Sequence, residues 1–213
     1  MIRARAADEV RDALALLYCR RENGSAELRV AVPRGGVARA RMPDRETKSR
    51  FVSAVLEAQP SDPGEELELF GESTANLDAR DRRRLRRRVG VLTPGLRLIS
   101  NLNGWENISL AAAYHGSPPL ERVEALARDT LRDLGADPRA LLARLPDELG
   151  SLERKLVAFT RLLASDPDLA VLDAVDEGLR AGEVSLSRRF EAQYRSRRPD
   201  GSLLHVDAER DPA

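Results

Sequence analysis

The sequence predicts an α/β domain that carries an inserted helical lobe. The apolar run Leu169–Leu172 ends at Asp173, and such a short run is typical of a strand buried on both faces of a parallel sheet. Between residues 96 and 163, apolar residues recur instead with the spacing of helices. Strands that alternate with helices, together with one block of helices, indicate this class of fold.

Two strands and a helix are expected in the first part of the chain. Apolar residues alternate with other residues over 26–41, and the turn residues Pro33–Gly36 divide this stretch into two strands. An amphipathic helix should follow, with Phe51 and Val55 on its apolar face. Proline and glycine over 60–64 end that helix, and Leu67–Gly71 reads as a short strand and a turn.

The second part begins with a charged run, Arg80–Arg88, that leads into a small strand over Val89–Leu92. One helix of the lobe keeps its apolar residues on one face from Leu120 to Leu134, and Gly135 supplies a natural end. Another helix follows Glu148, and the buried strand comes next. A last strand is expected over Ser202–Val206, after a proline and glycine turn.

Composition restricts the classes of function. The chain has 213 residues, with 35 Lys and Arg against 35 Asp and Glu, so its net charge favours neither nucleic acid nor an acidic membrane. Aromatic residues are only 4%, which argues against a base-stacking surface, and we expect no nucleic-acid partner. The single Cys19 fits a reducing compartment, and acidic residues interrupt any signal peptide near the amino end. The expectation is a cytoplasmic protein.

A dismantled phosphate-binding loop is the most informative motif. Such a loop reads G-x-x-x-x-G-K-[ST], because glycines let backbone N–H groups close around phosphates that the lysine also reaches. Lys48 and Ser49 stand at the end of this pattern, but Met42 and Thr47 occupy both glycine positions. A branched threonine crowds a turn of this kind, and the carboxylates of 44 and 46 would lie near the phosphates.

The order of the remaining segments resembles the ATP-binding subunit of an ABC transporter over residues 18–207. The segments that carry the resemblance are V-P-R-G-G-V, E-L-E-L-F-G-E-S, the stretch Arg88–Leu110 and the stretch Asp147–Asp173. The resemblance implies an ABC-type P-loop NTPase fold with a small antiparallel β subdomain and an inserted α-helical lobe. It also implies one nucleotide-binding-type domain over 1–213, with its core at 1–95 and 166–213 and its helical lobe at 96–165.

The resemblance also assigns site residues. Any contact with ATP that the chain keeps would involve Lys48, Ser49 and Tyr18, where the family places a ring against adenine. Any contact with Mg²⁺ would involve Asp173. The sequence alone leaves structural alternatives open, namely an exposed Lys48-Ser49 pair, a packed Tyr18 ring and a turn-capping Asp173.

A membrane permease is the partner that the resemblance implies, through Trp105 and Glu106. A second partner is a homologous cassette or another copy of this chain. The segment L-N-G-W-E-N-I-S-L-A-A-A-Y-H-G is most similar to cassettes of the lipid-transport branch that serves MCE-domain proteins. The chain would then lie on the inner face of the membrane, held there by its permease. Trp105 as a core residue is the alternative.

The departures from the family pattern are systematic and affect groups that bind ATP or catalyse its hydrolysis. Pro94 replaces the magnesium-sensing glutamine, and Leu149–Glu153 replaces the L-S-G-G-Q signature. Ala174 replaces the catalytic glutamate, whose loss costs about 10²- to 10⁴-fold in rate. The late histidine corresponds to Asp207, with His205 two residues away as a core residue. The chain is therefore expected to be a pseudo-ATPase that acts as an interaction or regulatory subunit.

Two other functions remain open at this point. The first is a slow ATPase in which Glu177 or Asp176 replaces the missing glutamate. The second is a freestanding regulator that binds protein or nucleic acid through the Arg80–Arg88 run, for which a solvated helix face is the structural alternative.

Overall fold

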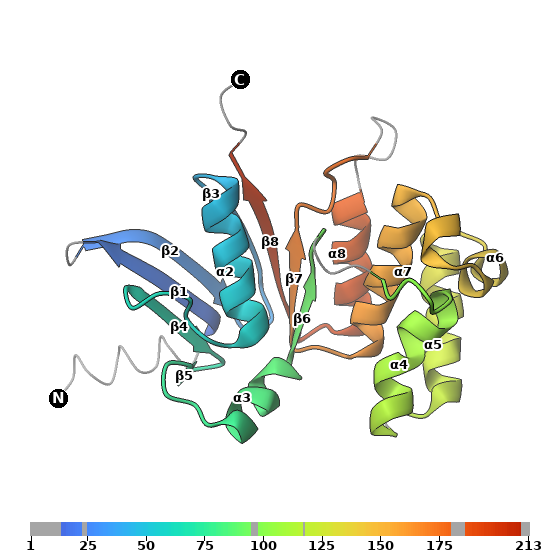
Figure 1. Ribbon diagram of the computed structural model, residues 1–213, viewed down its shortest axis with the longest axis horizontal. Helices are drawn as coiled ribbons and strands as arrows, with labels where there is room; N and C mark the ends of the chain where they lie inside the picture. The colour runs from blue at the N-terminus through green and yellow to red at the C-terminus, as the bar shows by residue number, and fades with distance from the viewer. Residues whose placement is uncertain (1–13, 23–24, 95–97, 117, 180–185, 210–213) are drawn as a thin grey trace. The chain divides into compact units, whose positions relative to one another are not determined.

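The chain divides into two compact units of strands and helices, which we describe separately (Figure 1). The computed structural model describes residues 14–22, 25–94, 98–116, 118–179 and 186–209. Unit 1 contains β1 (Leu14–Glu22), β2 (Ser25–Pro33), β3 (Val37–Met42), α2 (Arg45–Glu57), β4 (Glu65–Leu69), β5 (Glu72–Ser73), α3 (Ala79–Arg86), most of β6 (Val89–Leu92), β7 (Leu169–Asp173) and β8 (Ser202–Ala208). Unit 2 contains α4 (Gly104–His115), α5 (Leu120–Asp133), α6 (Pro138–Ala143), η1 (Pro146–Glu148), α7 (Ser151–Ala164) and α8 (Leu186–Arg197).

Unit 1 holds two sheets. The antiparallel sheet has the strand order β2-β1-β4-β5, and the other sheet has the order β3-β8-β7-β6. In the second sheet β8 runs parallel to both β3 and β7. All five residues of β7 are buried, as expected for a strand covered on both faces. The α/β class and the small antiparallel subdomain predicted from the sequence are confirmed.

Helix α2 connects the two sheets through a shared core. It lies along β3 and β8 (Figure 1), and its Phe51 and Val55 side chains are fully buried. The same core contains Tyr18 from the antiparallel sheet and Leu204 from the parallel sheet. The amphipathic pattern read from the sequence therefore faces the interior of unit 1.

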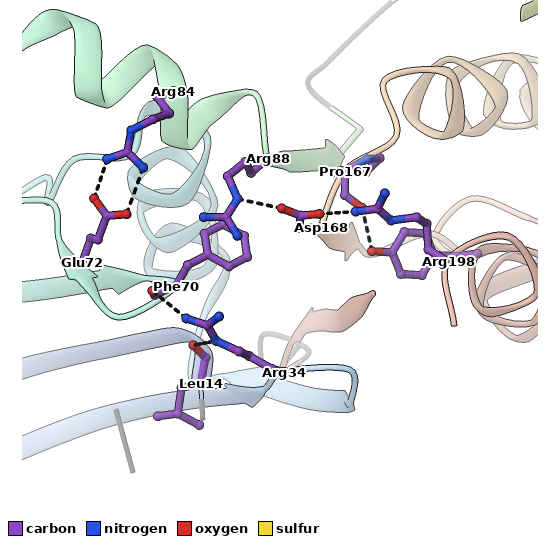
Figure 2. A network of polar contacts seen from close by, with 10 residues as sticks. Leu14, Arg34, Phe70, Glu72, Arg84, Arg88, Pro167, Asp168 and Arg198 are labelled. Carbon is purple, nitrogen blue, oxygen red and sulfur yellow. Dashed lines mark hydrogen bonds and ion pairs between the residues drawn. The ribbon is translucent and has the colours of Figure 1, made fainter. Parts of the chain in front are cut away.

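A network of arginines connects the two sheets (Figure 2). It lies where β6 and β7 begin, at the other end of β7 from Asp173. The Arg88 guanidinium lies over the Phe70 ring, 3.7 Å from its centroid, and Arg88 Nε donates to Asp168 at 2.6 Å. Arg198 also donates to Asp168, and Arg34 Nη2 donates to the Phe70 carbonyl at 2.7 Å. These contacts therefore hold together five segments that are distant from one another in the sequence.

Unit 2 is helical. Helix α7 packs against α4 and α5, and its Phe159 ring stacks on Phe190 of α8 with centroids 3.8 Å apart. Gly135 follows α5 with a φ of 76°, which agrees with the stop expected there. None of the described helices combines the length and apolar character that crossing a bilayer requires. The division into a core at 1–95 and 166–213 and a lobe at 96–165 stays a prediction.

Candidate functional site

The connection between β3 and α2 occupies the positions of the expected phosphate loop. Strand β3 ends at the fully buried Met42 and α2 begins at Arg45, so only Pro43 and Asp44 lie between them. Thr47 is already inside the helix. Within the described stretch 43–49, no residue has a positive φ. The two non-glycine residues are therefore accommodated by a short turn rather than by a strained, open loop.

The Asp44 carboxylate occupies the amino end of α2. Its Oδ1 accepts from the Thr47 backbone N–H at 2.6 Å, and its Oδ2 accepts from the Thr47 hydroxyl at 2.9 Å. The Thr47 backbone hydrogen bond is the main cause that lowers the pKa of Asp44 below its usual range. An ionised side chain of the chain itself therefore lies at the helix end where an external anion would bind.

Lys48 and Asp173 form an ion pair at this edge of the parallel sheet. Lys48 Nζ lies 2.6 Å from Asp173 Oδ1, and the side chains are 9% and 4% exposed. Asp173 ends β7, beside Val206 of β8, while Met42 of β3 pairs with Ala208. The three strand ends thus bring together the lysine and the aspartate that the resemblance assigns to phosphate and Mg²⁺. Ser49, by contrast, is exposed.

A cavity of about 560 Å³ opens beside the start of α2. Three of the residues that line it are arginines and three are carboxylates, namely Arg20, Arg41, Arg50, Asp44, Glu46 and Glu209. Arg50 pairs with Glu46 and with Asp62, each at 3.0 Å. The equal numbers of opposite charges give this cavity no excess of positive charge for a polyphosphate. In the described part of the chain, no cluster of His, Cys, Asp or Glu could hold a metal ion.

Tyr18 lies in the core of unit 1. It is 1% exposed, and its ring meets the Phe51 ring edge-on with centroids 4.9 Å apart. Burial, followed by a hydrogen bond to Glu65, raises the pKa of Tyr18 well above its usual value. This environment favours the packed-tyrosine alternative over a ring available to adenine.

The first residues after β7 differ in what they could supply as a general base. Ala174 is buried and has a left-handed φ of 45°, and a methyl group cannot accept a proton. The Asp176 carboxylate accepts from the Ser187 backbone N–H at 3.1 Å and from the Ser187 hydroxyl at 2.6 Å, at the start of α8. Glu177 is exposed.

Three further positions that the resemblance singles out lie in structural surroundings. Pro94 is an exposed turn residue just after β6. His205 is buried within β8 beside Leu172 of β7, which agrees with a core histidine, and Asp207 is exposed opposite Arg41 of β3.

The segment Leu149–Glu153, compared above with the signature, leads into α7. Glu153 Oε2 accepts from the Gly150 backbone N–H at 2.8 Å, and Arg144 pairs with the same carboxylate. The Gly150 hydrogen bond is the main cause that lowers the pKa of Glu153. A second helix end is therefore also approached by a carboxylate of the chain itself.

Trp105 and Glu106 lie in the first turn of α4. Glu106 exchanges backbone and side-chain hydrogen bonds with Asn103 at 2.8 and 2.9 Å, which is a capping box. Trp105 is half-buried, and farther along α4 the apolar side chains of Leu110 and Tyr114 are 44% and 83% exposed. Sequence reasoning singled out neither of these two exposed residues.

The Asp44 cap was also missed by sequence reasoning, which treated this residue only as a charge that repels phosphate. The signal was present, because an aspartate just before a helix commonly accepts from the backbone N–H three residues later. A search for helix caps as well as for a loop would have found it.

Comparison with known proteins identifies transport ATP-binding proteins as the relatives. No family model matches the chain. The chain is 28% identical over 109 residues to the methionine import ATP-binding protein MetN of Ralstonia nicotianae, which is 51% of this chain and 30% of the relative. It is 39% identical over 77 residues to the energy-coupling factor transporter ATP-binding protein EcfA2 of Streptococcus sanguinis, or 36% of this chain and 27% of that protein. The chain spans about a third of the length of the curated relatives it matches.

Solved structures share the fold. The ATP-binding cassette MJ0796 bound to ADP and Pi, in a dimeric structure, superposes with a TM-score of 0.70 at 18% identity, covering 93% of this chain and 87% of that one. CbiO1 from Clostridium perfringens, part of an ABC transporter complex, gives a TM-score of 0.70 at 16% identity, with 93% and 79% covered. The chain therefore has the P-loop NTPase fold of ABC nucleotide-binding domains, and its relatives are ABC transporter ATP-binding proteins.

Proposed function

We propose that this chain is a catalytically degenerate ATP-binding-cassette subunit that serves as an interaction partner beneath a membrane permease. It pairs there with a homologous cassette or with a second copy of itself, on the cytoplasmic face of the membrane. The observation that carries this proposal is the Asp44 carboxylate on the amino end of α2, in the position that an ATP phosphate would need.

Binding of ATP would have to displace that carboxylate and to separate the ion pair behind it. A phosphate approaching α2 meets the negative charges of Asp44 and Glu46, both of which line the adjacent cavity. Lys48 could reach the phosphate only by breaking its contact with the buried Asp173 carboxylate. Separating a buried ion pair is strongly unfavourable. The repulsion by the two carboxylates and the cost of separating the ion pair both oppose ATP binding at cellular ATP concentrations.

Hydrolysis is opposed independently of binding. A general base must lie within hydrogen-bond reach of the attacking water, and Ala174 offers no such group. Asp176 already accepts two hydrogen bonds from Ser187. The exposed Glu177 is the remaining candidate for the slow-ATPase alternative, and Glu177→Gln tests it directly.

The proposed permease contact lies at the amino end of α4. Trp105 is half-buried there, so part of its indole faces solvent while the rest is held by the protein, as in many interface anchors. One relative, MacB of Azoarcus, is itself an export ATP-binding/permease protein, 30% identical over 129 residues. Lipid is the cargo we would test first, because the segment around Trp105 resembles the lipid-transport branch, whereas the names of the relatives specify methionine and macrolides.

Calorimetric titration of the purified chain with Mg-ATP tests the degeneracy. We expect no binding heat up to millimolar ATP, with a competent cassette measured in parallel. Micromolar binding that is lost in Lys48→Gln, with unchanged circular dichroism, would contradict the proposal. A measurable ATPase rate abolished by Glu177→Gln would instead establish the slow-ATPase alternative.

Affinity capture from detergent-solubilised membranes tests the partnership. The tagged chain should retain a polytopic permease, and Trp105→Ala should reduce its recovery at least several-fold. Tyr114→Ala, which removes another exposed aromatic side chain of α4, is the matched control. Equal recovery with all three proteins would exclude Trp105 as the anchor, and recovery of no permease would contradict the assignment as a transporter subunit.

A further inference from the structure

Arg82 of α3 donates from Nη2 to the Leu77 carbonyl at 3.1 Å. The other arginines of α3, together with Arg87 just after the helix, fall into two groups when their ion pairs are considered. Arg84 Nη1 donates to Glu72 at 2.9 Å, as Figure 2 shows, and Arg86 Nη1 lies 3.2 Å from Glu57. The other group has exposed side chains and makes no ion pair within the described part of the chain. We call this second group the basic stripe; its members are Arg80, Arg83 and Arg87.

Helical geometry places the basic stripe on one face. Its members are separated by three and four residues, which brings neighbours to about 5–6 Å between Cβ atoms. Arg87 continues the helical conformation, with φ −66° and ψ −22°. The fully buried Leu85 lies on the opposite side of the helix and fixes α3 on the core. The stripe therefore points away from unit 1 and spans about 10 Å along the axis.

The stability of α3 itself does not account for the basic stripe. Like charges three or four residues apart destabilise a helix, and a cation in the first turn opposes the helix dipole. Arg80 stands in that first turn. Two carboxylates can offset part of this charge, but both are engaged elsewhere. Asp78 already accepts from two backbone N–H groups at 2.8 Å, and its pKa is lowered in part by the charge of Arg83. Asp81, also in the first turn, lies 3.5 Å from Arg84 Nε. An external anion would relieve this repulsion.

We propose that the basic stripe binds the anionic phosphate headgroups of a membrane surface. The inference rests on the proposed function, because a permease partner brings the chain beside a bilayer. Guanidinium groups form paired hydrogen bonds to phosphate oxygens, and three of them in a row match a dense, flat layer of headgroups. The contact gives the chain a second attachment to the membrane, independent of the permease.

The surroundings of the stripe favour this occupant over nucleic acid. Among the described residues, the large exposed apolar side chains all belong to unit 2, so α3 carries no aromatic platform on which bases could stack. Three phosphate contacts are also few for a duplex-binding protein. The same absence of apolar side chains predicts that α3 lies on the headgroups without inserting, so that salt should weaken its binding.

Vesicle flotation with the full chain tests the proposal without any permease. Vesicles of phosphatidylcholine containing about 30% phosphatidylserine should bind the protein, and pure phosphatidylcholine should not. Each stripe arginine is worth about five-fold in partitioning, so Arg80→Gln/Arg83→Gln should weaken binding about 25-fold. The matched control, Arg84→Gln/Arg86→Gln, removes the same charge from the same helix but only from paired side chains, and should change binding less than about three-fold.

Three outcomes of these binding experiments would count against the basic stripe as a membrane contact. Equal losses in the two double variants would show a diffuse attraction to charge, and no binding to phosphatidylserine vesicles would overturn the proposal outright. Tighter binding to a mixed-sequence oligonucleotide than to vesicles, lost in the stripe variant, would assign the stripe to nucleic acid. Thermal unfolding confirms that both variants are folded. If vesicles bind but no permease is captured, the stripe stands and the transporter assignment fails.

Discussion

The amino ends of α2 and α7 are both approached by carboxylates of the chain, but in different ways. At α2, Asp44 precedes the helix and accepts from the backbone N–H of Thr47, inside the first turn. At α7, Glu153 stands inside the first turn and accepts from the backbone N–H of Gly150, which precedes the helix. Asp44 therefore satisfies an amide that points along the helix axis, whereas Glu153 leaves such amides to other acceptors.

The two ends also differ in what lies behind them. Lys48 and Asp173 are buried together next to the start of α2, at 9% and 4% exposure. Arg144 and Glu153, at the start of α7, are 35% and 33% exposed. Water screens the second pair but not the first. The carboxylate contact at the start of α2 therefore lies next to an ion pair in the interior of unit 1. The carboxylate contact at the start of α7 belongs to an ion pair at the protein surface.

The largest expected effect follows from this difference in burial. Lys48→Met should lower the free energy of unfolding by about 3–5 kcal/mol, because it removes the cation from a buried ion pair. The matched change at the other end, Arg144→Met, should cost about 1 kcal/mol or less. Urea unfolding of both variants measures the contrast.

A double variant separates the charge from the packing. Lys48→Met/Asp173→Leu should recover most of the stability lost in Lys48→Met, since apolar residues can replace a buried pair at little cost. Similar losses for Lys48→Met and Arg144→Met would mean that both pairs are equally screened, and the distinction between the two helix ends would then fail.

The second contrast is the pH dependence of stability, measured by acid titration of the wild-type chain and of Asp44→Asn. The pKa of Asp44 is lowered in the folded chain, chiefly by the Thr47 backbone N–H. Its contribution to stability is therefore present above the unfolded pKa of about 3.9 and is lost as the pH falls through the lower folded value. The wild-type chain should be more stable than the variant at neutral pH, and the difference in stability should shrink as the pH falls below about 3.9 and through the lower folded pKa. Carboxyl NMR checks the folded pKa, and a value at or above 3.9 would contradict the cap.

Much of the fold could be predicted from local patterns. The four apolar residues before Asp173 proved to lie in the fully buried β7, and the amphipathic pattern around Phe51 proved to be α2. These patterns were readable because burial on one or two faces dictates residue type position by position. Helix α8 was not predicted, because only three of its 12 residues are buried and most of the others are polar or charged.

The candidate site was less readable, because it depends on which partners meet in space. The sequence placed Lys48, Asp173 and Asp44 near a phosphate position, but nothing local shows that the first two pair with each other or that the third caps α2. Tyr18 is a similar case, since its core contact with Phe51 joins a strand to a helix far along the chain. Such pairings follow from tertiary packing and not from spacing.

The smallest expected effect is that of Ala174→Gly, next to Asp173. This substitution relaxes the backbone and leaves every charged side chain in place. Ala174 has a left-handed φ of 45°, a conformation that costs a non-glycine residue about 1–2 kcal/mol and a glycine almost nothing. Glycine is also more flexible in the unfolded chain, which takes back about 0.4–1 kcal/mol. Ala174→Gly should therefore stabilise the chain by about 0.5 kcal/mol.

Ala125→Gly, at an exposed position within α5, should instead destabilise it by about 1 kcal/mol. Urea unfolding distinguishes the two signs, and a loss of stability in both variants would mean that the turn after β7 is not strained. The gain at Ala174 should come without any ATPase activity, because relaxing this turn neither removes Asp44 from α2 nor separates Lys48 from Asp173.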